Sequence, residues 1–292
     1  MLPDVLRDGK FRTRHEHSSL FRRLMRDLMM LPDPELVSTR ITDWTEGRVA
    51  RVTIQRPAKL NALDPATIRA IRSEAQSLAE NSSLRAVVLT GAGERAFVGG
   101  ADLETMAQLE PASAETFITE LHEAIAAVRA IPVPVIARID GFCLGAGLEL
   151  AAGCDLRIAS ERAAFGMPEV KVGMPSVIEA ALLPRLVGWG QANRLLLLGE
   201  VIDAAEALAI GLVEKVVPAT ELDTAVERWI AAILEAGAEA VRLQKALIRE
   251  WERLPLDEAI AAGITSFRRS FSGEEPRRML KSFKERRAKA RR

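Results

Sequence analysis

The chain has 292 residues, and its 40 Lys and Arg side chains balance 40 Asp and Glu side chains, so its formal net charge is zero. This balance argues against nucleic acid or an anionic membrane surface as the main partner, because both are bound through an excess of positive charge. The apolar stretches over 133–154 and 180–198 are interrupted by charged residues, so neither has the length of a membrane helix. We expect a soluble protein with no membrane partner.

Cysteine and histidine usage narrows the choice further. The two cysteines, Cys143 and Cys154, are too few for a disulfide framework and suit a reducing, cytoplasmic compartment. The three histidines, His15, His17 and His122, show no spacing that is typical of metal ligands. The sequence therefore predicts no metal site.

Residues 1–35 are predicted to form a flexible N-terminal extension. They are rich in Arg and end in Leu31-Pro32-Asp33-Pro34, which is typical of a linker because proline stops a helix. A short amphipathic helix is compatible with 18–30, and the Arg content is compatible with a transit peptide. The acidic residues in this segment argue against the transit peptide.

Beyond this extension, apolar strands alternate with helices. Asp64 and Pro65 supply an N-cap and a first-turn proline, so a helix is expected to begin there. The wholly apolar run 86–91 is typical of a strand buried on both faces. We predict strands over 49–55, 86–91, 135–139, 156–159 and 214–217. We predict helices over 65–79, 114–130, 178–186, 192–198 and 203–209, a helix through Glu149, and helices throughout beyond 221.

Two loops of small residues offer backbone N–H groups that a ligand can approach. They are Gly99-Gly100-Ala101 and Gly145-Ala146-Gly147. The second lies at a predicted helix start, where unpaired N–H groups and the helix dipole favour an anion. Two such donors suit a reaction in which negative charge develops on a carbonyl oxygen. Each loop by itself is also compatible with a plain tight turn.

Two glutamates accompany these loops. Most glutamates lie on the surface, but Glu149 is flanked by Leu148 and Leu150, so little of its helix can be exposed. Glu169 follows Pro168 at the end of a short strand-like segment. Two carboxyl groups beside a polarised carbonyl can act as general acid and general base. The sequence therefore indicates an enzyme.

The ordered motifs carry a family resemblance. They are G-G-A-D-L, D-G-x-x-x-G-A-G-x-E-L, F-G-x-P-E and G-E-V-I-D-A-A-E-A, followed by G-L-V-E-K-V-V-P. In this order they resemble the enoyl-CoA hydratase/isomerase (crotonase) superfamily, over 36–292. The resemblance implies an α/β fold with a crotonase-like spiral of repeated β-β-α units over 36–225. It also implies a C-terminal α-helical oligomerisation region over 226–292 and a homotrimer or homohexamer, whereas simple periodicity allows a doubly wound sheet.

The resemblance further implies an enoyl-CoA hydratase, a lyase that acts in fatty-acid or related acyl-CoA degradation. Such an enzyme adds water reversibly and in syn geometry to a trans-2-enoyl-CoA, giving a 3-hydroxyacyl-CoA. By similarity, the backbone donors fall on Ala101 and Ala146. Glu149 mainly activates water and Glu169 mainly transfers a proton at the α carbon, and the two can share one water molecule. No separate cofactor is implied, because coenzyme A is part of the substrate thioester.

Other positions match coenzyme A contacts in the family. They are Lys59, Leu60, Ala62, Gly99, Ala101, Asp102 and Leu103, together with Phe283 and Arg286, which in the family reach a neighbouring subunit's ligand. Lys59 is equally compatible with an exposed loop lysine. The run 277–292 has nine basic residues and one acidic residue, and it is also compatible with a solvated helix face. Asp102 is expected to cap the helix that follows it.

The chain departs from the family pattern in two places. Ala146 stands where the family often has glycine, and its methyl group limits the acyl pocket more than the chemistry. After Glu169, residues 172–186 replace a glycine-rich stretch that lines the acyl pocket in the family. The acyl chain length is therefore left open. Glu179, within this stretch, is either a third carboxylate of the site or a helix-surface residue.

Three alternatives to a hydratase are considered. A double-bond isomerase of the same superfamily uses one carboxylate, and a non-catalytic acyl-CoA binder is expected to lose a glutamate. The presence of both Glu149 and Glu169 weighs against each of these. RNA binding through the basic C-terminus is opposed by the zero net charge and by the absence of tyrosine and of an aromatic platform beside the basic run.

Overall fold

A computed structural model of the chain describes residues 35–289. The predicted N-terminal extension and the helix over 18–30 lie outside the described residues, apart from Glu35. The elements below belong to one compact unit that begins at Leu36. Within the described range, no helix is both long enough and apolar enough to cross a membrane.

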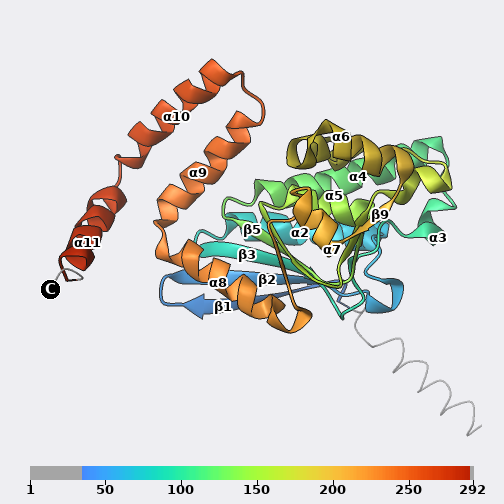
Figure 1. Cartoon of the computed structure of the whole chain (residues 1–292), viewed down its shortest axis with the longest axis horizontal. Helices are drawn as coiled ribbons and strands as arrows, with labels where there is room; N and C mark the ends of the chain where they lie inside the picture. Colours follow the sequence, from blue (N-terminus) through green and yellow to red (C-terminus); the bar gives the residue numbers. More distant parts are fainter. Residues whose placement is uncertain (1–34, 290–292) are drawn as a thin grey trace, which may run out of the picture. The chain divides into compact units, whose positions relative to one another are not determined.

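The large sheet has six strands, which lie at the centre of the fold (Figure 1). Its spatial order is β1, β2, β3, β5, β7, β10. The first two strands form an antiparallel hairpin, and every later pair in this order is parallel. The strands are β1 Val37–Trp44, β2 Gly47–Ile54, β3 Leu84–Gly91, β5 Val135–Ile139, β7 Leu156–Ser160 and β10 Lys215–Val217.

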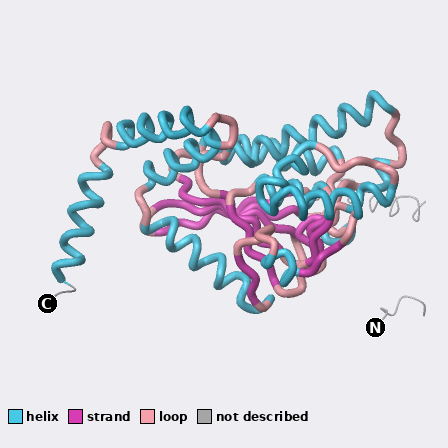
Figure 2. The backbone as a smooth tube through the Cα atoms, turned by 45° about the horizontal axis from the view of Figure 1, so that its top comes forward, coloured by secondary structure: helices cyan, strands magenta, loops and turns pink. Residues whose placement is uncertain are grey.

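A smaller four-stranded sheet lies alongside, in the order β4, β6, β8, β9. Three successive strand pairs, β3–β4, β5–β6 and β7–β8, each place the first strand in the large sheet and the second in the small one. Helices separate these pairs, so the chain winds as repeated β-β-α units (Figure 2). The predicted α/β spiral is confirmed. The small-sheet strands are β4 Ala96–Val98, β6 Phe142–Leu144, β8 Ala164–Gly166 and β9 Val201–Asp203.

The helices of the core begin where the sequence supplies caps. The side chain of Asp64 accepts the N–H of Thr67 at 2.8 Å and starts α2, as predicted. Glu110 and Ser113 form a capping box at the start of α4. The core helices are α2 Pro65–Glu80, α3 Leu103–Met106, α4 Pro111–Ala130, α5 Ala146–Gly153, α6 Leu183–Leu198, α7 Ala204–Ala209 and α8 Leu222–Glu235.

The large sheet is buried on both faces. Along β3, Val87 and Leu89 pack in the cluster that includes α2, α4 and α5. The alternate residues Ala86 and Val88 pack with the apolar residues of α8. Successive side chains of a strand point to opposite faces, so both must be apolar here. This packing explains the unbroken apolar run that the sequence shows.

Three further helices follow the core: α9 Ala238–Trp251, α10 Leu256–Ser270 and α11 Glu275–Lys289. The α10 helix packs beside α9 (Figure 1). The α9 helix is tied to the core by Lys245, whose Nζ donates to Oδ2 of Asp155 at 2.6 Å and to the carbonyl of Val133 at 2.8 Å. The prediction of helices beyond 221 is confirmed.

Two local predictions are wrong, and a third is correct in position but too short. The helix expected over 178–186 is a 3-10 helix, η3 Ile178–Leu182, which leads into α6. The helix expected over 192–198 is present as the second part of α6, which is interrupted at Gly188 with non-helical dihedrals (φ 75°, ψ 159°). Glu169 lies in a second 3-10 helix, η2 Pro168–Val172, rather than at a strand end. In both 3-10 helices the residues are too few for a helical period to be read from sequence.

Candidate active site

A cavity of about 510 Å³ brings the two small-residue loops and both glutamates together. One side is formed by Gly99, Gly100 and Ala101, and the other by the start of α5 and by η2. Apolar residues of α3 and α4 and the segment 172–177 complete the wall. The chain segments after strands β4, β6 and β8 therefore meet at one place, because these strands are neighbours in the small sheet.

Glu149 lies in the first turn of α5 and is 4% exposed. Its Oε1 accepts the backbone N–H of Ala180 at 3.1 Å. Burial raises the pKa of Glu149 to about 8, and the negative charges of Glu169 and Glu179 act in the same direction. The backbone N–H of Ala180 opposes this effect because it stabilises the ionised form. Glu149 is thus a carboxyl group that can gain or lose a proton near neutral pH.

Glu169 faces the same cavity from η2. Its Oε2 accepts the hydroxyl of Ser176 at 2.6 Å. Its Oε1 lies against Gly145, where a β carbon would overlap it. Gly145 also has φ 52° and ψ −123°, a conformation that residues with a side chain rarely adopt. The glycine before α5 therefore makes room for the second carboxylate.

Ala101 and Ala146 also line this cavity. Around Ala101, the N–H of Leu63 donates to Gly100 and the N–H of Asp102 donates to Leu63, both at 2.9 Å. The N–H of Ala101, which lies between these two bonds, has no acceptor in the part of the chain that the structure describes. Ala146 is the first residue of α5, and its N–H likewise has no acceptor there.

Close packing fixes the start of α5 against the Gly99–Ala101 loop. A β carbon on Gly147 would overlap the carbonyl oxygen of Val98, so α5 lies directly on β4. Asn61 braces the turn between β3 and β4, which leads to this loop, because its Nδ2 donates to the carbonyls of Ala92 and Ala96 at 3.0 and 2.8 Å. Asn61 is fully buried. We did not anticipate Asn61 or Ser176 as supporting residues, because neither role is encoded by local spacing.

The predicted coenzyme A positions fall into two groups. Gly99, Ala101 and Leu103 line the cavity of the glutamates, and Leu103 is exposed. Lys59, Leu60, Ala62 and Asp102 do not line it.

The second group has identifiable contacts. Lys59 is exposed and pairs with Glu104 at 2.8 Å. The carbonyl of Leu60 accepts the N–H of Gly99 at 2.8 Å. Asp102 accepts the N–H of Thr105 at 3.1 Å and so caps α3, as predicted.

Phe283 and Arg286 lie on α11, in the wall of another cavity of about 460 Å³ that also includes Phe267 and Phe271. Within this chain they are therefore not part of the cavity that holds Glu149. A contact with a neighbouring subunit's ligand stays a prediction.

Glu179 is buried, so its interpretation as a helix-surface residue is wrong. Its side chain is 7% exposed, and its Oε1 lies 2.9 Å from Nδ1 of His122 on α4. It lies outside the wall of the Glu149 cavity, so it is not a third carboxylate of that site. Local sequence gave no sign of this pairing, because the two residues are 57 positions apart.

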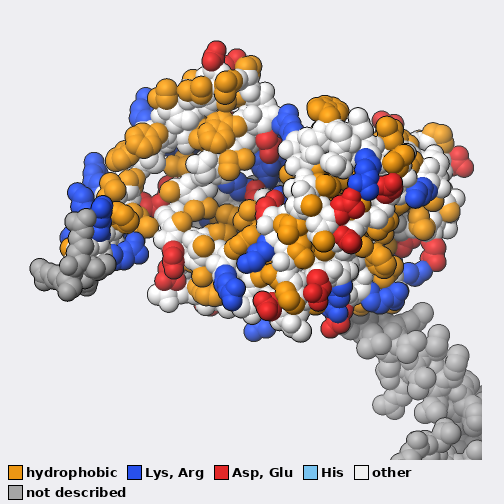
Figure 3. Space-filling model, viewed as in Figure 1, with side chains coloured by type: hydrophobic (Ala, Val, Ile, Leu, Met, Phe, Trp, Pro, Cys, Tyr) orange, Lys and Arg blue, Asp and Glu red, His pale blue; other side chains and the backbone are white. Residues whose placement is uncertain are grey.

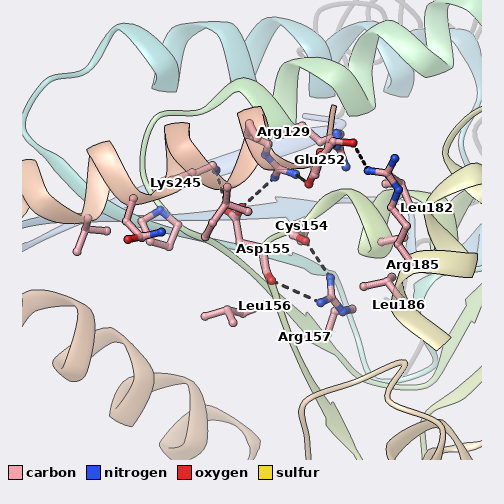
Figure 4. Close-up of a pocket in the computed structure, with 16 residues that line it drawn as sticks. Arg129, Cys154, Asp155, Leu156, Arg157, Leu182, Arg185, Leu186, Lys245 and Glu252 are labelled. Carbon is pink, nitrogen blue, oxygen red and sulfur yellow. Dashed lines mark hydrogen bonds and ion pairs between the residues drawn. The ribbon is translucent and has the colours of Figure 1, made fainter. Parts of the chain in front are cut away.

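A separate cavity of about 360 Å³ lies between α9 and the end of α5 (Figure 4). Five of its charged side chains are paired with one another. Asp155 accepts from Lys245 at 2.6 Å and from Arg249 at 2.9 Å, and Glu252 accepts from Arg129 at 2.7 Å. These ion pairs connect α9 to the core, and the cavity holds neither Glu149 nor Glu169.

Residues 45–290 match the family model described as enoyl-CoA hydratase/isomerase. The chain belongs to this family. It is 38% identical over 243 residues to a short-chain-enoyl-CoA hydratase of Clostridium acetobutylicum, covering 83% of this chain and 93% of that protein. It is 37% identical over 243 residues to a crotonyl-CoA hydratase of Syntrophomonas wolfei, covering 83% and 94%.

Solved structures agree with this family membership. An enoyl-CoA hydratase from Bacillus anthracis superposes with a TM-score of 0.81 at 31% identity, covering 86% of this chain and 96% of that one. The DspI protein of Pseudomonas aeruginosa superposes with a TM-score of 0.82 at 31% identity, covering 88% and 97%. The predictions of the crotonase family, of its fold and of an enzyme of the hydratase type are confirmed.

Proposed function

We propose that this enzyme adds water reversibly, in syn geometry, to a trans-2-enoyl-CoA and releases a 3-hydroxyacyl-CoA. One observation carries the proposal. Glu149 and Glu169 line the same cavity as Ala101 and Ala146, whose backbone N–H groups have no acceptor among residues 35–289. Two proton-transferring groups and two anion-stabilising donors are what this hydration needs.

The backbone donors act on the thioester oxygen. When water adds to C3 of the conjugated thioester, the electron pair of the double bond moves toward the carbonyl and an enolate develops. The N–H groups of Ala101 and Ala146 bind the oxygen that gains this charge. They are held by β4 and by the start of α5, so they need little reorganisation during the reaction.

The two carboxyl groups move the protons. Glu149, once ionised, takes a proton from water while the water oxygen bonds to C3. Glu169 gives its proton to C2, and the carbonyl of the thioester forms again. Glu149 then releases its proton and Glu169 regains one through water, which restores the starting state. A base whose pKa is near 8 is stronger than a solvated glutamate, provided that it is ionised when the substrate binds. The net change is one water molecule added across the double bond.

Substrate recognition is proposed from the cavity wall and from the relatives' names. Apolar side chains of α3 and α4 line the cavity, which suits a hydrocarbon acyl chain. Two relatives are named for short-chain or crotonyl substrates, so crotonyl-CoA is the first substrate to test. We expect coenzyme A itself to bind near Leu103, Lys59 and Ala62, with Phe283 and Arg286 contributed by a neighbouring subunit. No separate cofactor is proposed.

We further propose a cytoplasmic homotrimer or homohexamer. Residues 36–225 form the catalytic core, and residues 226–292 form the oligomerisation region. An apolar stripe on α10 supports this assignment, because large apolar side chains are exposed along one face of that helix and at its C-cap: Leu256, Ile260, Ile264, Phe267 and, at the cap, Phe271. Cys143 and Cys154 are both buried free thiols, as suits a reducing compartment.

The test is hydration of crotonyl-CoA, followed by loss of the conjugated-enoyl absorbance. Glu149→Gln and Glu169→Gln keep the side-chain shape but remove basicity, so each should lower kcat by at least about 100-fold. Glu120→Gln is the matched control, because Glu120 of α4 forms a partly exposed ion pair with Arg69 of α2. Near-parental hydration by either site variant would refute the two-carboxylate mechanism. Isomerase activity retained in that variant would favour a double-bond isomerase instead.

A further inference from the structure

Two consecutive residues before Ala180 are in unfavourable states. Ile178 has φ 39°, in the left-handed region that a β-branched side chain rarely adopts. Glu179 is buried, and within 35–289 its Oε2 has no hydrogen-bond partner. Strained backbone and unsatisfied buried polar atoms persist only where surrounding structure holds them, and they are concentrated at functional sites.

The next residue is the one that contacts Glu149. The N–H of Ala180 donates to Oε1 of Glu149 at 3.1 Å and also reaches the carbonyl of Val177 at 2.9 Å. On the other side, Oε1 of Glu179 lies 2.9 Å from Nδ1 of His122. Neighbouring residues of η3 therefore bond to α5 and to α4, the two helices that line the substrate cavity.

We propose that His122 and Glu179 form a positioning pair for Glu149. The hydrogen bond between them holds η3 against α4, so that the N–H of Ala180 points at the Glu149 carboxylate. Neither side chain lines the cavity of the two glutamates, so neither is a catalytic residue. The inference rests on the proposed role of Glu149 as the group that activates water.

The charges around Glu179 add a second effect. Glu179 lines a cavity of about 670 Å³ with five charged or titratable side chains, which are His122 and Arg129 of α4 and Arg249, Glu250 and Arg253 of the α9 end. Burial raises the pKa of Glu179, whereas His122 and Arg129 lower it. An ionised Glu179 in turn raises the pKa of Glu149. The pair is therefore expected to affect both the position and the basicity of the catalytic carboxylate.

The first experiment compares two substitutions of His122. His122→Ala removes the bond to Glu179, and η3 is expected to relax away from Glu149. We expect kcat for crotonyl-CoA to fall roughly 10-fold with little change in KM, because misplacement of a reacting group affects turnover more than binding. His122→Asn keeps an N–H donor at the position of Nδ1 and should recover most of the loss. Equal kcat in the parent and in the Ala variant would overturn the proposal.

The second experiment uses Glu179→Gln, which keeps the side-chain shape and an acceptor for His122 but removes the charge. The pH at which Glu149 ionises, read from the profile of kcat/KM, should move to lower pH. Glu250→Gln is the matched control, because Glu250 lines the same cavity but is exposed and is not bonded to η3. A profile that stays in place for Glu179→Gln, or that moves equally for Glu250→Gln, would overturn the proposal.

Three outcomes separate this inference from the proposed function. If Glu149→Gln hydrates crotonyl-CoA normally, the proposed function fails, and the positioning role fails with it. If Glu149→Gln is inactive while the His122 and Glu179 variants match the parent in both kcat and pH profile, only the positioning role fails. Circular dichroism and thermal unfolding establish that each variant is folded. If His122→Ala unfolds, Glu179→Leu, which also removes the bond between the two side chains, takes its place in the comparison of kcat, and a parental kcat in that variant would overturn the proposal.

Discussion

The carboxylate of Glu169 packs directly against Gly145, so that a β carbon at this glycine would overlap Oε1 of Glu169. The two residues belong to different turns of the spiral, one just before α5 and the other in η2. The glycine that starts the helix with the backbone donor therefore also determines where the second carboxyl group lies. The oxyanion site and the acid–base pair are not independent.

This contact gives the first prediction. Gly145→Ala should displace Glu169 and strain the loop, lowering kcat for crotonyl-CoA by roughly 100-fold, as expected when a reacting group moves by about 1 Å. Gly190→Ala is the control, because no atom lies within 4 Å of a β carbon at that position. Steady-state kinetics of both folded variants provide the measurement. Unchanged kcat in Gly145→Ala would show that Glu169 does not need its present position.

The second prediction concerns pH. The pKa of Glu149 is raised to about 8, chiefly by burial, so the carboxyl is mostly protonated below that pH. If the ionised form takes the proton from water, kcat/KM should rise as the pH increases through about 8. Initial rates between pH 6 and 9.5, roughly spanning that value, measure this limb. The enzyme's folded state should be checked at each pH.

The opposite slope has a definite meaning. A fall in kcat/KM above pH 8 would show that the protonated form of Glu149 is the active one. Glu149 would then deliver the proton to C2, and Glu169 would activate water. The cavity and the backbone donors would keep their roles.

The third prediction concerns the backbone donors. Ala146 is the first residue of α5, a position where proline is sterically tolerated, so Ala146→Pro removes the N–H without breaking a helix bond. Turnover should fall by roughly 100- to 1,000-fold, the loss expected for one oxyanion donor. Ala146→Gly keeps the N–H and should retain turnover close to that of the parent. Coenzyme A affinity, measured in parallel, verifies that the Pro variant still binds ligand.

Ala101→Pro tests the other donor in the same way. Its N–H bonds to no described residue, so proline there breaks no hydrogen bond of the loop. A folded proline variant at either position that binds coenzyme A and still hydrates crotonyl-CoA at the parental rate would contradict the assignment of that N–H.

The fourth prediction concerns assembly. Figure 3 shows apolar side chains gathered over α10, where the apolar stripe lies. Sedimentation equilibrium should give a trimer or hexamer for the parent, and Ile264→Glu should shift it toward monomer because it places a charge in the stripe. Ala261→Glu, exposed on the same helix outside the stripe, should leave the assembly intact. A monomeric parent at micromolar concentration would refute the oligomerisation region.

Local sequence was sufficient to predict the large sheet and the long helices. Strands β2, β3, β5 and β7 each span five residues or more and are rich in apolar residues, and α2 has its cap at Asp64. The strands of the small sheet span three residues each, too few for an alternating pattern to be recognised. Their pairing comes from the winding of the chain, and the family resemblance indicated that winding where periodicity did not.

The candidate site, too, was only partly recognisable from the sequence. Glu149 was recognisable from its apolar neighbours, and the small-residue loops from their composition. The supporting contacts of Asn61, Ser176 and His122 join residues distant in the chain or in irregular loops, so no periodic pattern reveals them. Their roles depend on which segments the spiral brings together.

The proposed oxyanion site has a consequence for how such an enzyme can diversify. Its two donors are backbone N–H groups, so every substitution of either alanine except proline keeps the donor. The segment from Met174 to Val177 also lines the cavity, and we expect its side chains to contact the acyl chain. New substrate preferences can therefore be acquired by exchanging residues in that segment while the machinery that stabilises the enolate is inherited unchanged.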